Sequence, residues 1–312
     1  MKKILSEILD YHRRYFHLSL FITIALFLAV LIAFNYLFDF EDDYIDKLPQ
    51  AKRMVGLFLY QGLPYLVICL LLYFFNIQRT WIRSSGFWLR FIIGFLILAF
   101  SRSYTRHHWL TQLFSGIDLI FARHVMHNLW KFFALMIPLV VFYLVADRHK
   151  TTRLYGLVFN RFSARPYFII LGIALVCIGI GSFFRDIQDY YPLFYRYRGH
   201  VFAEVNNWPL WTAILTYEIP YALDFINVEF FFRGFLVVGF TRYLGPHAVL
   251  PMVAAYCALH FGKPMTEAIS SIFGGYILGV ISYHSRTIWG GAIIHAGTAW
   301  AMEIVGFLWR LA

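Results

Sequence analysis

The chain has 312 residues, of which 60% are hydrophobic and 14% are charged, and it contains 34 Phe, 21 Tyr and 9 Trp. Soluble globular domains carry about 25% charged residues, so this composition excludes a soluble enzyme, a disordered chain and a fibrous repeat. The formal net charge of +10 comes largely from basic residues at the ends of apolar stretches, where they face anionic lipid headgroups, so nucleic acid is not the expected partner.

Apolar stretches follow one another along the chain and predict about eight or nine membrane spans. The first sixteen residues mix apolar and basic positions, which predicts an amphipathic helix on the membrane surface. The predicted spans are, in chain order, 17–38, 54–75, 87–100, 130–146, 167–184, 211–243, 248–261, 266–283 and 288–309, and a weaker stretch at 109–122 is either re-entrant or interfacial. We therefore expect an all-α, polytopic transmembrane helical bundle with an N-terminal amphipathic helix.

Basic residues predict the orientation and a boundary. A cytoplasmic N-terminus places most basic loops inside, as the positive-inside rule requires, and we expect a multi-pass protein of the bacterial inner membrane. The residues that fall outside and weaken this fit are Arg102, Arg106, Arg185, Arg196 and Arg198. The most basic loop divides an N-terminal bundle of unknown role, 1–147, from a C-terminal core, 148–312, and it contains Arg148, Lys150, Arg153, Arg161 and Arg165.

Ionisable side chains inside apolar helices are costly, and each one marks a functional site by default. They are concentrated in the C-terminal half, where they are Glu218, Asp224, Glu229, Arg233, His260, Lys263, Glu267, His295 and Glu303. The N-terminal half places most of its charges in loops.

Three short stretches carry the chemistry. Glu229 and Arg233 are spaced i,i+4, so they share a helix face and can pair. His260 precedes a Gly and Pro break, and His295 lies among small residues that permit close helix contact. If the three helices converge, their carboxylate, guanidinium and imidazoles form a water-activating site inside the membrane. The alternatives are a structural ion pair and histidines that serve only in packing.

Two further glutamates are candidates for a supporting role. Glu267 follows Pro264 at a helix start, where a carboxylate also favours the helix dipole, and Lys263 lies nearby. Glu303 lies eight residues after His295, about 80° around the helix. From there it either reaches the same cavity or pairs with Arg310 near the surface.

These residues resemble the CAAX-processing and bacteriocin-processing (CPBP, or Abi) family of intramembrane proteases. The family pattern is Glu-Glu-x-x-x-Arg, then aromatic-x-x-x-His, then His-x-x-x-Asn, on successive transmembrane helices. Glu229 with Arg233, Tyr256 with His260, and His295 match it, and the resemblance covers about 150–312. It implies hydrolysis by water that a glutamate and His260 activate, with His295 as an oxyanion donor. Arg233 would orient the glutamate.

Two positions depart from the family pattern. The first glutamate, usually the catalytic one, is Val228 here, and the Asn of the third motif is Ala299. Positions 228 and 229 point about 100° apart on a helix, so Glu229 cannot simply replace its neighbour. Loss of one oxyanion donor typically costs about 10²–10³ in rate. The resemblance thus implies a variant enzyme or a non-catalytic relative.

Three hypotheses follow. The leading one is a metal-free intramembrane endopeptidase that acts on a prenylated or leader peptide, with catalytic residues Glu229, Arg233, His260 and His295. A close alternative uses zinc held by Glu229, His260 and His295, because a His₂Glu set suits that ion. The third is an inactive membrane scaffold or immunity factor, which Val228 and Ala299 favour. A transporter is disfavoured, because the buried charge is confined to one half of the chain.

Overall fold

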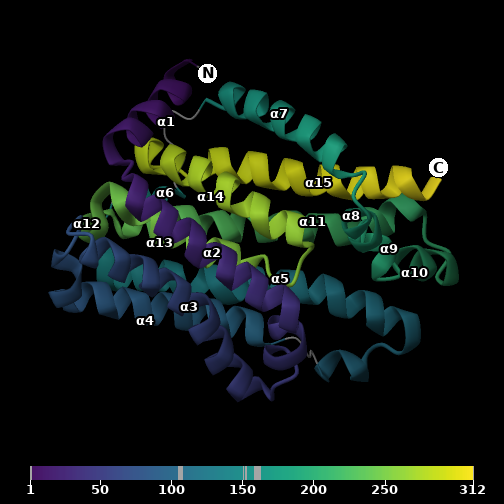
Figure 1. Cartoon of the computed structure of the whole chain (residues 1–312). Helices are drawn as coiled ribbons and strands as arrows, with labels where there is room; N and C mark the ends of the chain where they lie inside the picture. The colour runs from purple at the N-terminus through teal and green to yellow at the C-terminus, as the bar shows by residue number, and fades with distance from the viewer. Residues whose placement is uncertain (1, 105–107, 150, 152, 158–162, 312) are drawn as a thin grey trace.

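The computed structural model describes residues 2–104, 108–149, 151, 153–157 and 163–311, and every regular element in that part is helical (Figure 1). The predicted all-α helical bundle is confirmed. Among the basic residues used for orientation, Arg106, Lys150 and Arg161 lie outside the described residues.

The elements are long helices joined by short helical segments. The helices are α1 Lys2–Tyr15, α2 Leu18–Phe38, α3 Gln50–Phe74, α4 Ser85–Ser103, α5 Gly116–Phe142, α6 Arg153–Gly156, α7 Arg165–Gly181, α8 Arg185–Tyr190, α9 Leu193–Arg196, α10 Gly199–Val205, α11 Leu210–Glu229, α12 Thr241–Leu244, α13 Val249–Leu259, α14 Met265–Ser285 and α15 Trp289–Leu311. Segments of 3₁₀- or π-helix are η1 Phe40–Ile45, η2 Thr80–Arg83, η3 His108–Gln112, η4 Tyr143–Asp147, η5 Phe230–Gly239 and η6 Gly245–Ala248.

Six helices in the described residues are long and apolar enough to cross a membrane. They are Leu18–Phe38, Gln50–Phe74, Ser85–Ser103, Gly116–Asp147, Met265–Ser285 and Trp289–Leu311. The other predicted spans correspond to α7, which has 17 residues, to α11 continued by η5, and to α13. The chain is therefore a multi-pass helical membrane protein, and its span count agrees roughly with the sequence prediction.

One division predicted from the sequence is wrong. The stretches at 109–122 and 130–146 are not separate, because residues 116–147 form one continuous 32-residue span. The polar residues that interrupt the apolar pattern there, His124, His127, Asn128 and Lys131, line an internal cavity and do not end the helix. Polar side chains that face a cavity are compatible with a membrane helix.

The two halves of the chain share a core. Helix α3 packs against α13 and α5 packs against α11, and one buried cluster combines Tyr65 and Phe95 with Phe231 and Phe235. Gly94 of α4 permits this contact, since a Cβ there would lie 2.2 Å from the ring of Phe235. The C-terminal helices are thus braced by the N-terminal ones along their length.

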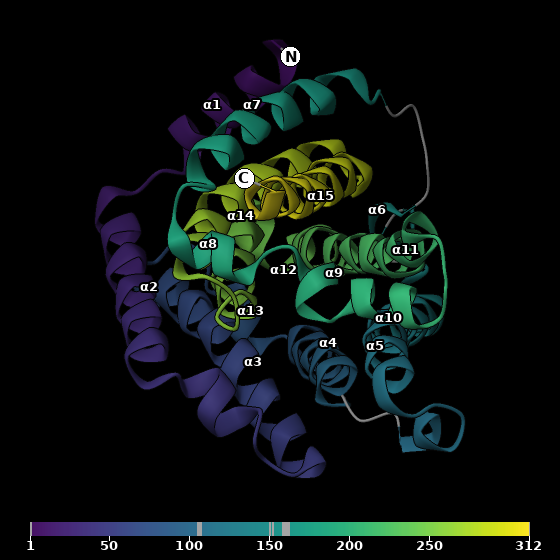
Figure 2. The same cartoon turned by 90° about the vertical axis from the view of Figure 1, so that its right-hand side faces the viewer.

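The outermost helices lie on one side of the bundle. Figure 2 shows α7 and α1 lying over α15 and α14. Helix α1 inserts Tyr11, which is 2% exposed, and its hydroxyl donates a 2.6 Å hydrogen bond to the carbonyl of Pro246. Arg13 and Arg14 of the same helix remain exposed. The amphipathic character expected for this segment therefore serves packing on one face and solvent contact on the other.

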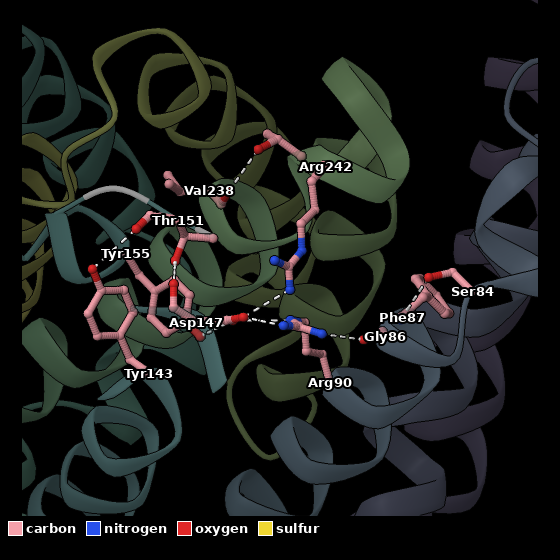
Figure 3. Close-up of polar contacts among 11 residues, drawn as sticks. Ser84, Gly86, Phe87, Arg90, Tyr143, Asp147, Thr151, Tyr155, Val238 and Arg242 are labelled. Atoms are coloured by element: carbon pink, nitrogen blue, oxygen red, sulfur yellow. Dashed lines mark hydrogen bonds and ion pairs between the residues drawn. The ribbon is translucent and has the colours of Figure 1, made fainter. Parts of the chain in front are cut away.

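A buried group of charges, the Asp147 cluster of Arg90, Asp147, Tyr155 and Arg242, joins the two halves (Figure 3). Arg90 forms an ion pair with Asp147 through Nη2 and donates from Nε at 3.1 Å. Arg242 lies 2.9 Å from the same carboxylate, and the Tyr155 hydroxyl donates to it at 2.5 Å. Gly86 accepts from Nη1 of Arg90 at 2.7 Å. The cluster links α4, η4, α6 and α12.

A second ion pair explains one exception to the predicted orientation. Arg102, at the end of α4, lies 2.6 Å from the carboxylate of Glu41 in the acidic segment η1. Glu41 is 2% exposed, so a basic residue is required beside it whichever side of the membrane this end occupies. Arg102 therefore carries little information about orientation, and the cytoplasmic N-terminus stays a prediction.

Candidate active site

A cavity of about 260 Å³ lies between the two halves of the bundle. Helices α4 and α5 form one side, α11, η5 and α13 form the other, and His295 of α15 reaches it as well. Its charged, imidazole and amide side chains are Arg102, His124, His127, Asn128, Lys131, Asp224, Asn227, His260, Lys263 and His295. Concave sites with a few convergent polar groups in apolar walls are typical of ligand and reaction sites.

His260 lies on this cavity at the C-terminal end of α13. Its Nδ1 is 2.8 Å from the carbonyl oxygen of Tyr256 one turn earlier, and the residue is 6% exposed. A carbonyl oxygen only accepts hydrogen bonds, so Nδ1 carries the proton and the neutral ring keeps a lone pair on Nε2. The ring is therefore oriented as a proton acceptor.

Glu229, Arg233, Tyr256 and His295 form a second buried group, the Glu229 cluster. Glu229 Oε1 lies 2.9 Å from Nη1 of Arg233 and 3.2 Å from Nδ1 of His295. Arg233 places its guanidinium carbon 4.0 Å from the ring centre of Tyr256, whose hydroxyl is 3.4 Å from Nε2 of His295. The predicted pairing of Glu229 with Arg233 is confirmed. Three helical segments meet here, namely α11 continued by η5, α13 and α15, and α13 contributes Tyr256 in place of the expected His260.

Gly291 makes this convergence possible. A Cβ at this position of α15 would lie 2.0 Å from Oε2 of Glu229, far closer than two non-bonded heavy atoms can approach. The carboxylate thus occupies the space that any side chain at 291 would fill. Among the small residues that precede His295, Gly291 is therefore the one that lets the carboxylate contact α15.

The cavity wall separates Glu229 from its neighbour Val228. Glu229 and Arg233 are each 0% exposed and lie behind the wall, whereas Val228 and His295 line it. The position where the family pattern has its first glutamate therefore faces the cavity, and it carries a valine. Glu229 holds the Nδ1 side of His295, which places it behind an imidazole that reaches the cavity.

The two supporting glutamates lie away from this cluster. Glu303 accepts hydrogen bonds from the backbone amides of Leu193 at 2.8 Å and Phe194 at 3.3 Å. Glu303 was expected either to reach the cavity or to pair with Arg310, and both expectations are wrong. Its carboxylate instead caps the start of α9, and the residue does not line the cavity. Glu267 lies 3.2 Å from Nζ of Lys263 in the first turn of α14, so it bears on the cavity only through that lysine.

The amide absent at position 299 has possible substitutes that sequence analysis does not identify. Ala299 packs in an apolar cluster with Tyr217 and Tyr221. Asn128 and Asn227 line the cavity, and Asn227 donates at 3.1 Å to the carbonyl of Lys131. Two amide side chains therefore line the same cavity as His260 and His295.

Helix α5 contributes the residues that sequence interpretation assigns to no function. His124, His127, Asn128 and Lys131 are spaced 3, 1 and 3 residues apart, the spacing of one helix face. That regularity was a usable signal, because polar residues scattered at a break in a helix would not repeat with a helical period. They bring the N-terminal half into the cavity.

The donor set does not fit the zinc alternative. Within the described residues, no group of three His, Cys, Asp or Glu side chains is arranged to hold a metal ion. His260 directs Nδ1 to a backbone carbonyl, while Glu229 lies behind the cavity wall with Arg233 on the oxygen that faces His295. The three residues therefore lack a common point at which a cation would sit.

Comparison with known proteins supports the resemblance found in the sequence. Residues 211–301 match a family model described as type II CAAX prenyl endopeptidase Rce1-like, a region that includes Glu229, Arg233, His260 and His295. A search of curated proteins and a search of solved structures gave no match. The match confirms the CPBP resemblance and supports a CAAX protease-like function at the level of the family.

Proposed function

We propose that the chain is an intramembrane endopeptidase of the CAAX type, which hydrolyses a membrane-associated peptide in the cavity between α5, α11 and α13. The observation that carries this proposal is His260, a cavity histidine whose Nδ1 contact with Tyr256 leaves Nε2 free of a proton. The family match supplies the reaction class. Membrane lipids and a prenylated or leader peptide are the proposed partners, in a bacterial inner membrane with the N-terminus in the cytoplasm.

His260 is the proposed general base. Its Nε2 takes a proton from water as the oxygen adds to the scissile carbonyl carbon. The same proton passes to the departing amide nitrogen when the C–N bond breaks. One water and one peptide bond thus give one carboxylic acid and one amine, and this step needs no metal ion.

His295 is the proposed stabiliser of the oxyanion. Glu229 contacts its Nδ1, which holds the ring in one orientation and supports a positive charge on it. A protonated His295 would donate from Nε2 to the tetrahedral oxygen, in place of its 3.4 Å contact with the Tyr256 hydroxyl. Arg233 neutralises the remaining charge of Glu229, so Glu229 and Arg233 act as positioning residues.

A cleavage assay tests the proposal. The full-length protein is reconstituted in phospholipid vesicles with a farnesylated peptide that ends in a Cys-aliphatic-aliphatic-X sequence, and products are identified by mass spectrometry. We expect cleavage by the wild type and a loss of about 10²-fold or more in His260→Ala, which removes general base catalysis. His284→Ala is the matched control, because His284 is an exposed histidine that does not line the cavity.

The competing function is an inactive membrane scaffold or immunity factor, which Val228 on the cavity wall favours. A scaffold would cleave neither the farnesylated peptide nor an unprenylated leader peptide, and His260→Ala would leave partner binding unchanged. Cleavage that His260→Ala abolishes and His284→Ala preserves excludes this alternative. Equal activity in the wild type and His260→Ala would overturn the assignment of the base.

A further inference from the structure

We propose that Asp224 is a catalytic residue and supplies the carboxylate that family members carry at the position of Val228. This inference rests on the proposed endopeptidase function. Asp224 is the only carboxylate among the described residues that line the cavity. It lines the same space as His260, His295, Asn227 and Lys263 and lies near the C-terminal end of α11.

Helix geometry places Asp224 on the required face. Positions 224 and 228 are four residues apart, about 40° around the helix and one turn along it, whereas 228 and 229 differ by about 100°. The cavity lining follows this rule, since it includes Asp224 and Val228 and omits Glu229. A carboxylate one turn away on the same face can therefore serve the cavity, and the adjacent carboxylate cannot.

Exposure supports the same choice. The side chain of Asp224 is 15% exposed, and that of Glu229 is 0% exposed. Glu229 contacts Arg233 and His295 through Oε1, and it does not line the cavity. Asp224 also lies close enough to Lys263 for their charges to interact, and Lys263 lines the same cavity.

Lys131 of α5 holds Asp224 ready for this role. Its Nζ lies 2.5 Å from Oδ2 of Asp224, so the carboxylate has a counter-charge beside it in apolar surroundings. The backbone carbonyl of Lys131 accepts the 3.1 Å hydrogen bond from Asn227, which fixes α5 against α11. The second oxygen, Oδ1, has no hydrogen bond to the described residues and is available to a water.

The step is a hydrolysis in which Asp224 and His260 share the work. A water donates one hydrogen bond to the Asp224 carboxylate and its other proton to Nε2 of His260, while its oxygen bonds to the carbonyl carbon. The proton on His260 then passes to the amide nitrogen, and the C–N bond breaks. Asp224 orients the nucleophile and stabilises the imidazolium, and it ends the cycle ionised as it began.

The experiment uses the full-length protein in vesicles with the farnesylated peptide. We expect Asp224→Asn to lower kcat/KM by about 10²-fold or more, Asp224→Glu to retain part of the rate, and Asp224→Asn/Val228→Glu to regain activity. The rescue is expected because position 228 faces the same cavity. Loss of fold is a separate risk, since Asp224→Asn leaves Lys131 uncompensated. Asp224→Asn/Lys131→Gln removes both charges and should unfold near the wild-type temperature while staying inactive.

The outcomes separate the two proposals. A wild type that cleaves, with His260→Ala inactive and a folded Asp224→Asn/Lys131→Gln fully active, overturns the role of Asp224 and leaves the endopeptidase standing. A wild type that cleaves neither the farnesylated nor the leader peptide overturns both. Inactivity of the double variant with recovery through Val228→Glu supports Asp224, because a purely structural aspartate would not be replaced by a carboxylate one turn away.

Discussion

Two buried groups of charges lie in one bundle, and they differ in how fully their polar atoms are paired. In the Asp147 cluster, both carboxylate oxygens accept hydrogen bonds, and Arg90 also donates to the carbonyl of Gly86 (Figure 3). In the Glu229 cluster, Oε2 of Glu229 and the guanidinium nitrogens of Arg233 make no hydrogen bond within the described part of the chain. The first group is complete, and the second is not.

The difference follows their locations. The Asp147 cluster joins α4 to α12, and none of its four residues lines the cavity. The Glu229 cluster stands directly behind the cavity wall and holds His295, which lines it. Buried polar atoms without partners are rare and need an explanation. Here the explanation is that the Glu229 cluster is arranged to orient the imidazole of His295, and its remaining polar atoms are left without hydrogen bonds.

The largest expected effect is a loss of stability when the Asp147 cluster is broken. Asp147→Asn leaves Arg90 and Arg242 without their counter-charge, and breaking such a buried pair typically costs about 3–5 kcal/mol. We expect the variant to unfold well below the wild-type temperature in detergent and to accumulate poorly. Arg79→Gln is the control, since Arg79 is an exposed arginine and its loss should change stability by less than about 0.5 kcal/mol. An unchanged unfolding temperature in Asp147→Asn would contradict the structural role.

The second expected effect separates stability from chemistry in the Glu229 cluster. Glu229→Gln/Arg233→Met removes both charges, and replacing a buried ion pair with neutral groups is often neutral for stability. We expect the unfolding temperature to stay near that of the wild type. Cleavage of the farnesylated peptide should fall by about 10²-fold, because His295 loses the contact that orients it.

Glu229→Gln alone provides the contrast for that double variant. It leaves Arg233 uncompensated inside the protein, so it should be less stable than the double variant and equally inactive. Full activity in the folded double variant would contradict a positioning role and would make Glu229 and Arg233 a structural pair, the simpler of the two interpretations that the sequence allowed.

The third effect concerns Gly291. Gly291→Ala forces the Glu229 carboxylate away from α15, because the new Cβ would lie 2.0 Å from Oε2. We expect about 1–3 kcal/mol of destabilisation and a tenfold or larger loss of cleavage. Gly274→Ala is the matched control in α14, since a Cβ there meets nothing within 4 Å. Equal behaviour of the two variants would show that the close approach at Gly291 is unimportant.

Sequence patterns predicted the fold well where hydrophobicity alone decides the structure. Long apolar runs gave the helices, and i,i+4 spacing gave the contact between Glu229 and Arg233. The pattern failed at α5, where four polar residues looked like a break in a helix. Those residues face a cavity. A cavity forms only where separate helices pack against one another, so the hydropathy of a single helix cannot predict it.

The site was predictable in its members but not in their arrangement. Local motifs identified His260 and His295, both of which line the cavity. They could not place Glu229 behind the wall, because that depends on the rotation of α11 and on the contact that Gly291 allows. Glu303 was equally undetermined, since its partners, the amides of Leu193 and Phe194, lie about a hundred residues away.

The smallest expected effect is that of a substitution at His247. It tests whether a buried polar atom without a hydrogen bond is by itself a sign of function. His247 is buried in η6 at 9% exposure, and its Nδ1 has no hydrogen-bond partner among the described residues, yet it lies outside the cavity lining. Burial, and after it the charge of His17, lowers the pKa of His247 from 6.5 to about 4. Between these two values the unfolded chain binds more protons than the folded one, so this residue makes stability fall as the pH drops from 6.5 to 4 and leaves it constant above 6.5.

His247→Gln should therefore remove part of the acid sensitivity, seen as a smaller drop in unfolding temperature between pH 7.5 and pH 4.5 than in the wild type. Cleavage at pH 7.5 should stay within about twofold of the wild type, because His247 does not line the cavity and therefore has no reacting atom to serve. A folded His247→Gln that lost cleavage at pH 7.5 would show that a residue outside the cavity lining can affect activity. Incomplete hydrogen bonding would then no longer separate the Glu229 cluster from the Asp147 cluster by function. The contact of His295 with the cavity would then be the single feature that assigns chemistry to the Glu229 cluster.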